Sequence, residues 1–372
     1  MKLLISGYYG FRNAGDEAIL AGMVEMFRAE GWDPTVLSAD PAWTERVHGV
    51  AAVDRRSWRG IRAALQAADV FISGGGGLLQ DATSLRSNLY YLGLLRLARR
   101  FHRKTMLFAQ SIGPLRARLS RFLVRWGIRD VDAFTVRDER SRRQLAELGW
   151  EAGRVAVTAD PAFVAPAAAP ERGQAILAAE GIPQDRPLLG VSLRPTAHQA
   201  RLFREVAAAL ASLVDELGVR VVLLPFQPEL DGGLAAQAQA AIRRPAWTHV
   251  LQGEYPIPEL LALIGQLEFL VGIRLHSLIF AACQGVPFVG ISYDPKVEGF
   301  LEVFGGTPVG TVQALTAADL VAGVRGAWAQ RETLRQEVAS QAAAMRRKAW
   351  ENLVPLRAWA REDRGREGRL GG

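Results

Sequence analysis

In KLLISGYYGFRNAGDE, residues 2–17, a short apolar run leads through a glycine-rich turn into the start of a helix. We expect a buried strand over Lys2–Ser6. After the turn, apolar residues follow at the spacing that places them on one face of a helix. These residues are Ile19, Leu20, Met23, Val24 and Phe27. Strand, turn and helix in this order form the repeating unit of parallel α/β folds.

Short apolar runs and longer amphipathic segments continue to alternate along the chain, so we predict an α/β fold with parallel sheets. In the first half, strands are expected at Lys2–Ser6, Thr35–Ser38, Val70–Ser73, Thr105–Gln110 and Ala133–Arg137. In the second half, they are expected at Leu188–Leu193, Val221–Pro225, Phe269–Ile273 and Phe288–Ser292. Helical patterns are expected at Phe203–Leu217, at Ile257–Gln266 and over a long region near 317–353.

A change of composition at PAFVAPAAAP, residues 161–170, divides the chain into two halves of similar size. This Pro- and Ala-rich stretch is typical of a linker between domains. We predict an N-terminal α/β domain over 1–165, a linker region over 166–186 and a C-terminal α/β domain with long helices over 187–355. The charged, glycine-rich tail 361–372 is predicted to be disordered. Two such halves imply a cleft, and parallel sheets bind ligands at the carboxyl ends of their strands.

The composition bounds the class of protein. Of 372 residues 49% are hydrophobic and 22% charged, which excludes wholesale disorder. The single cysteine, Cys283, excludes a disulfide scaffold and a Cys-rich zinc site. The expected strand at Lys2 leaves no room for a leader peptide, and no apolar run of about 20 residues occurs. We therefore expect a cytoplasmic protein.

The net charge of +7 comes almost entirely from arginine. This charge is consistent either with a solvated basic surface or with binding to an anionic partner, such as a phosphorylated ligand, an acidic membrane surface or nucleic acid. The arginines are scattered without interleaved aromatic residues, so nucleic acid is the weakest of the three and we expect none to bind. The sequence shows no dedicated amphipathic membrane anchor.

Two glycine-rich loops follow predicted strands. The first has glycines at 7, 10 and 15, which is not the G-x-G-x-x-G pattern of dinucleotide sites. Within it, Asn13 suits a turn and Asp16 suits the first turn of a helix, and either residue also suits a ligand site. The second loop, SGGGGLLQD at 73–81, favours close backbone approach to a ligand over a simple tight crossover. We therefore expect Gly74, Gly75 and Gly76 to bind substrate.

Basic residues lie at or just after the carboxyl ends of several predicted strands. They are Arg137, Arg194, Arg274 and Lys296. Any one of them is ordinarily solvated, but together they predict a site for phosphate and carboxylate groups. His276 lies in an apolar segment beside Arg274; a buried core histidine is the ordinary interpretation, and a proton-transfer group is the functional one. Because no cluster of metal-ligand side chains occurs, we predict a site without metal or cofactor.

Seven segments resemble, in order, the motif series of the polysaccharide pyruvyl transferases, and most nearly the CsaB-type branch. They are GYYGFRNAGDEAIL, SGGGGLLQD, AQSIGPL, ADPAF, PFQPELD, GIRLHSLIFA and GISYDPKVEGF, and they extend from residue 7 to residue 300. Arg12 departs from the pattern, which expects a small or aromatic residue there. The resemblance implies two Rossmann-like domains facing across a cleft, as in GT-B glycosyltransferases.

The resemblance also implies the chemistry. The donor would be phosphoenolpyruvate, and the product a 4,6-linked pyruvate ketal on a sugar. In the CsaB-type branch the acceptor is a β-N-acetylmannosamine of a lipid-linked secondary cell wall polymer precursor, whose pyruvylation supports S-layer anchoring; this places the enzyme at the inner face of the membrane. His276 would be the acid and Asp16 the base, with the two roles exchangeable. Asn13, Arg137, Arg194, Arg274, Lys296 and the glycine loop would bind substrate.

Three other functions remain open at this point. A GT-B glycosyltransferase that uses a nucleotide sugar would have the same architecture. A non-catalytic sugar-phosphate binding module would keep the cations but would not need His276 and Asp16. DNA binding through the basic surface is the most distant alternative.

Overall fold

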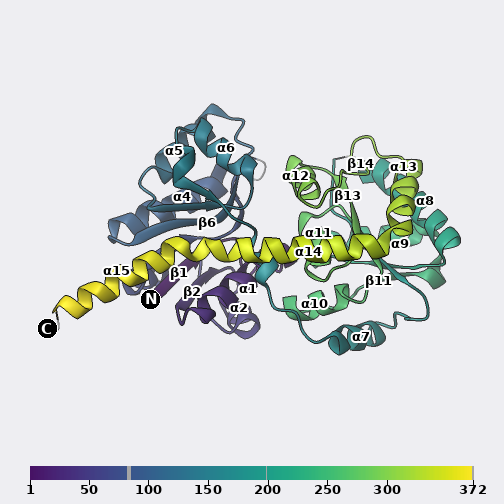
Figure 1. The fold of residues 1–372 in the computed structure, drawn as a ribbon, viewed down its shortest axis with the longest axis horizontal. Helices are drawn as coiled ribbons and strands as arrows, with labels where there is room; N and C mark the ends of the chain where they lie inside the picture. The colour runs from purple at the N-terminus through teal and green to yellow at the C-terminus, as the bar shows by residue number, and fades with distance from the viewer. Residues whose placement is uncertain (82–84, 198, 371–372) are drawn as a thin grey trace. The chain divides into compact units, whose positions relative to one another are not determined.

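The computed structural model describes residues 1–81, 85–197 and 199–370, and Figure 1 shows the course of the chain. It divides into two compact units. The first contains residues 1–12, 16–165 and 345–372, and the second contains 13–15 and 166–344. The chain therefore leaves the first unit briefly at residues 13–15, leaves it again after Ala165, and returns at Met345.

The first unit is built on a parallel sheet in which β1 pairs with β2 on one side and with β4 on the other. The order is β3 (Ala51–Asp54), β2 (Asp33–Ser38), β1 (Lys2–Ser6), β4 (Val70–Ser73), β6 (Lys104–Ile112), β7 (Ala133–Val136) and β8 (Val155–Val157). A further strand, β5 (Gly76–Leu79), pairs with β6. The helices between them are α1 (Ala14–Ala29), α2 (Pro41–His48), α3 (Trp58–Ala67), α4 (Leu85–Arg100), α5 (Arg118–Ile128) and α6 (Glu139–Glu147).

The second unit repeats this plan with another parallel sheet. The order is β11 (Thr248–Val250), β10 (Arg220–Leu223), β9 (Leu188–Ser192), β12 (Phe269–Gly272), β13 (Phe288–Ser292) and β14 (Gly310–Thr311). Its helices are α7 (Pro170–Ala179), α8 (Gln199–Leu217), α9 (Pro228–Ile242), α10 (Ile257–Ile264), α11 (Leu275–Cys283), α12 (Pro295–Val303), α13 (Ala317–Ala329) and most of α14 (Arg331–Trp350).

The predicted α/β fold with parallel sheets is confirmed. Every predicted strand overlaps an observed one, because the buried strands of parallel sheets carry nearly continuous apolar runs. The predicted apolar stripe of α1 is also confirmed, since its five side chains are at most 3% exposed. The strands that the sequence did not indicate are short or glycine-rich: β3, β5, β8, β11 and β14.

Two segments outside the sheets contain helices that the sequence analysis did not assign. The range 166–186 is not a bare linker, because it contains α7, whose Gly173 packs against the carbonyl group of Ala262 in α10. The range 361–372, for which disorder is predicted, includes the end of α15, which covers Val354–Leu370; residues 371 and 372 lie outside the described residues.

The C-terminal residues also belong to the first unit rather than the second. The buried side chain of Asn352 accepts a hydrogen bond from Thr158 Oγ1 at 2.7 Å and donates one to the carbonyl oxygen of Ala159 at 3.1 Å. Arg357 forms an ion pair with Glu30, the residue that follows α1, at 2.7 Å. These contacts hold the beginning of α15 against the first unit. No helix among the described residues is both long and apolar enough to span a bilayer.

Candidate active site

The predicted site residues fall into two groups, one in each unit. The second unit holds Asn13, Arg194, Arg274, His276 and Lys296. The first unit holds Asp16, Arg137 and the glycines of the loop after β4. In both units these residues follow the carboxyl ends of parallel strands, where α/β sheets bind ligands.

In the second unit two cations converge on one aromatic ring. The guanidinium carbon of Arg194 lies 3.9 Å from the ring centroid of Tyr293, and Nζ of Lys296 lies 5.2 Å from the same centroid. Among the described residues, neither cation forms an ion pair, and the buried Nε of Arg194 has no hydrogen-bond partner. Uncompensated charge held at one place is suited to an anionic ligand.

The start of α12 adds to this positive potential. Asp294 caps the helix by accepting a hydrogen bond from the backbone N–H of Lys296 at 3.0 Å, and Pro295 occupies the first turn. The N-terminus of a helix carries partial positive charge, so it favours an anion and repels a lysine side chain. Lys296 at this position therefore strengthens an anion site at some cost to the helix.

Arg274 differs from these two cations because it already has a carboxylate partner. Its Nη2 donates to Oδ1 of Asp231 at 2.6 Å, and the side chain of Asp231 is only 2% exposed. Oδ2 of Asp231 accepts from the backbone N–H of Gln227 at 2.9 Å. The side chain of Gln227 in turn accepts from Nδ2 of Asn13 at 3.1 Å. A chain of hydrogen bonds thus joins Arg274 to Asn13.

The segment Asn13–Gly15 is fixed against the second unit by its backbone. Ala14 N–H donates to the carbonyl oxygen of Phe226 at 2.9 Å, and Asn13 accepts from the N–H of Gly15 at 3.0 Å. Gly15 lies against His276: a Cβ built on Gly15 would be 2.2 Å from Nδ1 of the imidazole. His276 thus contacts the residue that immediately precedes Asp16.

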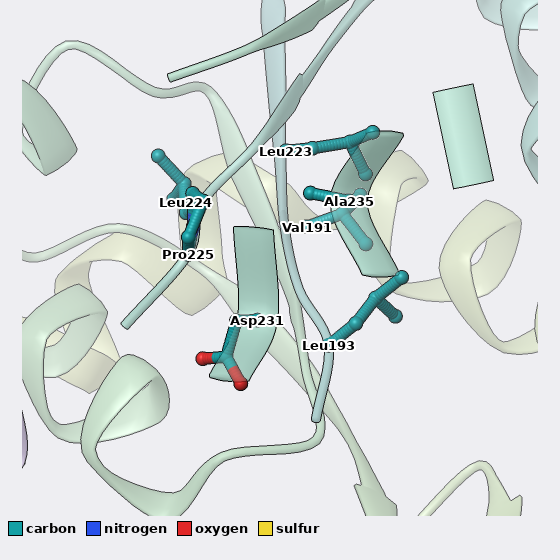
Figure 2. Close-up of a pocket in the computed structure, with 7 residues that line it drawn as sticks. All are labelled: Val191, Leu193, Leu223, Leu224, Pro225, Asp231 and Ala235. Carbon is teal, nitrogen blue, oxygen red and sulfur yellow. The ribbon is translucent and has the colours of Figure 1, made fainter. Parts of the chain in front are cut away.

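A small pocket lies at the carboxyl ends of β9 and β10 (Figure 2). Leucine, valine, proline and alanine side chains form most of its lining, and Asp231 is the charged residue among those lining it. The lining residues are Val191, Leu193, Leu223, Leu224, Pro225, Asp231 and Ala235. The carboxylate that holds Arg274 is therefore set in apolar surroundings, which strengthens its hydrogen bonds.

In the first unit the glycine loop packs around a buried tyrosine and helix α1. A Cβ on Gly74 would lie 2.3 Å from Oη of Tyr9, and one on Gly75 would lie 2.8 Å from a methyl group of Ile19. Gly76 has a φ of +99°, and a Cβ there would be 3.2 Å from Oδ1 of Asp16. Protein contacts thus account for Gly74 and Gly75, whereas Gly76 faces the predicted base; whether the loop binds substrate stays a prediction.

The hydroxyl group of Tyr9 stays protonated near the carboxylates of Asp16 and Glu17. Burial raises the pKa of its hydroxyl well above the usual value, and the negative charges of Asp16 and Glu17 raise it further. Its Oη lies 3.6 Å from Sδ of Met23. Because this phenol is neutral, the negative charge near the glycine loop is carried by Asp16 and Glu17 and not by Tyr9.

Arg137 is buried, with 7% of its side chain exposed, and its Nη1 is 2.5 Å from Oδ2 of Asp160. Burial alone would lower the pKa of the guanidinium, but Asp160, Asp138 and Asp16 raise it. Asp160 also accepts from the N–H of Ala162 at 3.0 Å. Because Asp160 balances its charge, Arg137 has less positive potential to offer a ligand than Arg194 or Lys296.

A buried pair formed by Glu17 and His48 was not identified from the sequence. Nε2 of His48 lies 2.9 Å from Oε2 of Glu17, and each side chain is 3% exposed. The other oxygen of Glu17 accepts from the N–H of Gly10 at 2.9 Å. The pair fixes the first glycine-rich loop. The only available signal was Glu17 beside Asp16 in the first helical turn; the partner, 31 residues away, had none.

Among the described residues, no three His, Cys, Asp or Glu side chains gather in an arrangement that could hold a metal ion. The family model described as polysaccharide pyruvyl transferase matches residues 13–295, which is most of the chain and includes Gly15 and His276. No protein with a curated description matches the sequence.

Solved structures share the fold at low sequence identity. Anabaena HepE in complex with UDP and glucose is 13% identical, with a TM-score of 0.63 over 98% of this chain and 100% of that one. Staphylococcus aureus MnaA in complex with UDP is 11% identical, with a TM-score of 0.65 over 92% and 91%. The Escherichia coli ADP-heptose heptosyltransferase II is 16% identical, with a TM-score of 0.54 over 89% and 100%. The likeness to these GT-B glycosyltransferases and epimerases concerns the fold and agrees with two Rossmann-like domains.

Proposed function

The chain belongs to the polysaccharide pyruvyl transferase family, and from this premise we propose that it transfers the pyruvyl group of phosphoenolpyruvate to a sugar as a 4,6-O-ketal. The resemblance of its motifs to the CsaB-type branch favours a β-N-acetylmannosamine of a lipid-linked secondary cell wall polymer precursor as acceptor. In that role the enzyme would act at the inner face of the membrane, and its product would support the anchoring of S-layer proteins.

The observation that carries the proposal is the cation pair around Tyr293. Phosphoenolpyruvate is a small ligand with a carboxylate and a phosphate, and Arg194 and Lys296 are cations without an ionic partner among the described residues. Arg194 supplies a planar group that grips a carboxylate or phosphate through two hydrogen bonds, and Lys296 supplies a mobile point charge. Arg274 is already bound to Asp231, so it would offer the ligand hydrogen-bond donors in a fixed position rather than an unbalanced positive charge.

The proposed reaction begins when His276 gives a proton to the C3 methylene of the donor, which leaves an oxocarbenium-like C2. One sugar hydroxyl adds to C2 and loses its proton to Asp16. The bond from C2 to the phosphate oxygen then breaks, and inorganic phosphate leaves with the electron pair while Lys296 offsets its charge. The second hydroxyl closes the ketal and gives its proton to the departing phosphate, which leaves as hydrogen phosphate. One proton is gained at C3 and two are lost from the hydroxyls, so the exchange releases one proton with the phosphate.

The principal rival is a glycosyltransferase that uses a nucleotide sugar, because HepE and MnaA, which share the fold, were crystallised with UDP. The rival predicts a site for a base and a ribose, whereas the proposal needs only a small anion site. Donor binding therefore separates the two functions.

The test is phosphate release by the purified full chain from phosphoenolpyruvate with a synthetic N-acetylmannosamine acceptor, together with mass spectrometry of the sugar. We expect phosphate and a pyruvylated sugar in equal amounts, and an increase in the thermal unfolding midpoint with phosphoenolpyruvate but not with UDP-sugars. Stabilisation by UDP-sugars alone, with no phosphate released, would replace the proposal by its rival.

A further inference from the structure

Helix α5 of the first unit exposes large apolar side chains. Leu119 is 55% exposed, Phe122 64% and Trp126 43%. The three lie three and four positions apart in the sequence, so they form one stripe along the helix. The opposite stripe, with Val124 and Ile128, is buried in the core of the unit.

The neighbouring helix α4, which packs beside α5, extends this apolar patch (Figure 1). Leu89 of α4 is 48% exposed, and the guanidinium of Arg96 lies 4.6 Å from the ring centroid of Trp126. Leu89, Leu119, Phe122 and Trp126 make up half of the strongly exposed large apolar side chains among the described residues. We call the surface formed by these four residues and the arginines beside them the α4–α5 face. Exposed apolar groups gathered on one face mark an interaction site.

The stretch of sequence that contains both helices is strongly basic, although Asp130, which follows α5, forms ion pairs with Arg96 and Arg129. Residues 82–129 contain ten arginines and one lysine but no aspartate or glutamate. That stretch carries more positive charge than the net +7 of the whole chain, so the remainder is net negative. On α5, Arg121 is 3.5 Å from Glu147, whereas the exposed Arg118 and Arg125 form no ion pair with any described residue. The basic balance is therefore a local property rather than a scattered one.

We propose that the α4–α5 face docks on the surface of a lipid bilayer that contains anionic lipids. Trp, Phe and Leu on one side of a helix insert at the boundary between headgroups and acyl chains, while arginines beside them bind lipid phosphates. A second copy of the chain is a poorer occupant, because pairing this face with itself would bring like charges together. Nucleic acid gains little from Leu119 and Phe122, which have no place against a duplex backbone.

The inference rests on the surface alone and not on the proposed pyruvyl transfer, so either can fail without the other. If the acceptor is lipid-linked, docking through this face brings the enzyme to its substrate. The sequence concealed the feature, because a stripe of Leu, Phe and Trp at helical spacing ordinarily faces a core.

The test is co-sedimentation of the full chain with vesicles, without any substrate. We expect binding to vesicles of phosphatidylcholine and phosphatidylglycerol, weaker binding to phosphatidylcholine alone, and weaker binding to both at high salt. Failure to bind the anionic vesicles at low salt would overturn the proposal. Equal binding to both vesicle types would contradict the role given to the arginines and overturn it as well.

Paired variants locate the surface. Phe122→Gln with Trp126→Gln should reduce binding to anionic vesicles at least about tenfold, because two interfacial side chains no longer insert. Arg118→Gln with Arg125→Gln should reduce it about thirtyfold at low salt and much less at high salt. The control, Trp58→Gln with Arg59→Gln on α3, changes an exposed Trp and an exposed Arg elsewhere on the same unit and should bind as the unchanged chain does.

Thermal unfolding of each variant separates lost binding from lost folding, since these exposed side chains should leave the midpoint nearly unchanged. Variants of the α4–α5 face that bind as tightly as the control would overturn the proposal. A chain that sediments as a dimer, and as a monomer only when Phe122 and Trp126 are replaced, would assign the face to a second copy and overturn it too.

Discussion

The backbone of Gly15 lies so close to His276 that a Cβ on Gly15 would be 2.2 Å from Nδ1 and 2.5 Å from Cγ of the imidazole. Gly15 is the second residue of α1, where alanine would ordinarily favour the helix by about 1 kcal/mol. Its helical position therefore does not require glycine, and its contact with His276 does.

Gly15→Ala tests this relationship. The added methyl group must displace the imidazole, and a shift of about 1 Å at a reacting group costs about a hundredfold in rate. We expect phosphate release to fall by that order while the unfolding midpoint stays nearly unchanged. The matched control is Gly326→Ala in α13, where a Cβ meets nothing within 4 Å. Full activity in Gly15→Ala would show that the position of His276 does not matter to the reaction.

His276→Ala removes the proposed acid itself. Groups of this kind contribute about 10²–10⁴-fold, so we expect kcat to fall within that range while phosphoenolpyruvate still raises the unfolding midpoint. His249→Ala in β11 is the control for loss of a histidine in the same unit. If turnover of His276→Ala stays within about tenfold of the unchanged enzyme, the acid role is wrong.

Arg194→Gln and Lys296→Gln test the two cations around Tyr293. Each variant loses one charged hydrogen-bond donor, which is worth about 1.5–3 kcal/mol, so we expect KM for phosphoenolpyruvate to rise about tenfold to a hundredfold. Arg204→Gln, at a side chain 74% exposed on α8, is the control and should leave KM unchanged. An unaltered KM in both site variants would remove the main support for a small anion as donor.

Glu180 offers a pH-dependent test of stability in the second unit. Partial burial would raise the pKa of its carboxyl, but hydrogen bonds from Tyr255 Oη at 2.5 Å and from the N–H groups of Gln252 and Gly253 lower that pKa below its ordinary value. A group with a lowered folded pKa contributes stability above its unfolded pKa and loses that contribution as pH falls through the folded value.

We therefore expect Glu180→Gln to lower the free energy of unfolding by about 1–3 kcal/mol at pH 7, and by clearly less at pH 3. Denaturant titration of both proteins at the two pH values measures the difference. Tyr255→Phe, which keeps both backbone hydrogen bonds, should cost less at pH 7. A cost that does not change with pH would mean that the carboxylate charge is not what stabilises this corner.

Much of the fold and part of the site could be predicted from the sequence, because both depend on local patterns. Apolar runs gave the buried strands, and strand ends indicated Arg194, Arg274 and Lys296 as site candidates. Long-range pairing has no local pattern: Asp231 lies 43 residues from Arg274. For the same reason the sequence could not distinguish paired cations from unpaired ones.

The assignment of residues to the two units also could not be predicted from their order in the chain. Residues 13–15 lie within the predicted first domain, yet hydrogen bonds to Phe226 and Gln227 place them in the second unit. The residues in these contacts are more than 200 positions apart, and no periodic pattern in the sequence indicates such contacts. The C-terminal helix shows the same limit, because its assignment to the first unit depends on Asn352 and Arg357 finding partners far back in the chain.

Asp231→Asn tests whether the network from Arg274 to Asn13 is built around one carboxylate. The variant keeps the size of the side chain but leaves Arg274, whose side chain is 14% exposed, without its counter-charge. Breaking such a buried pair costs about 3–5 kcal/mol, and we expect a loss of stability near that range together with a higher KM for phosphoenolpyruvate. Asp215→Asn removes the partner of Arg244 from an exposed ion pair whose atoms are 2.6 Å apart and should cost less than about 1 kcal/mol.

Adding Arg274→Met to Asp231→Asn should restore much of the stability, since no unpaired charge then remains buried, but it should not restore the activity. Recovery of activity in that double variant would show that Arg274 serves the structure and not the donor.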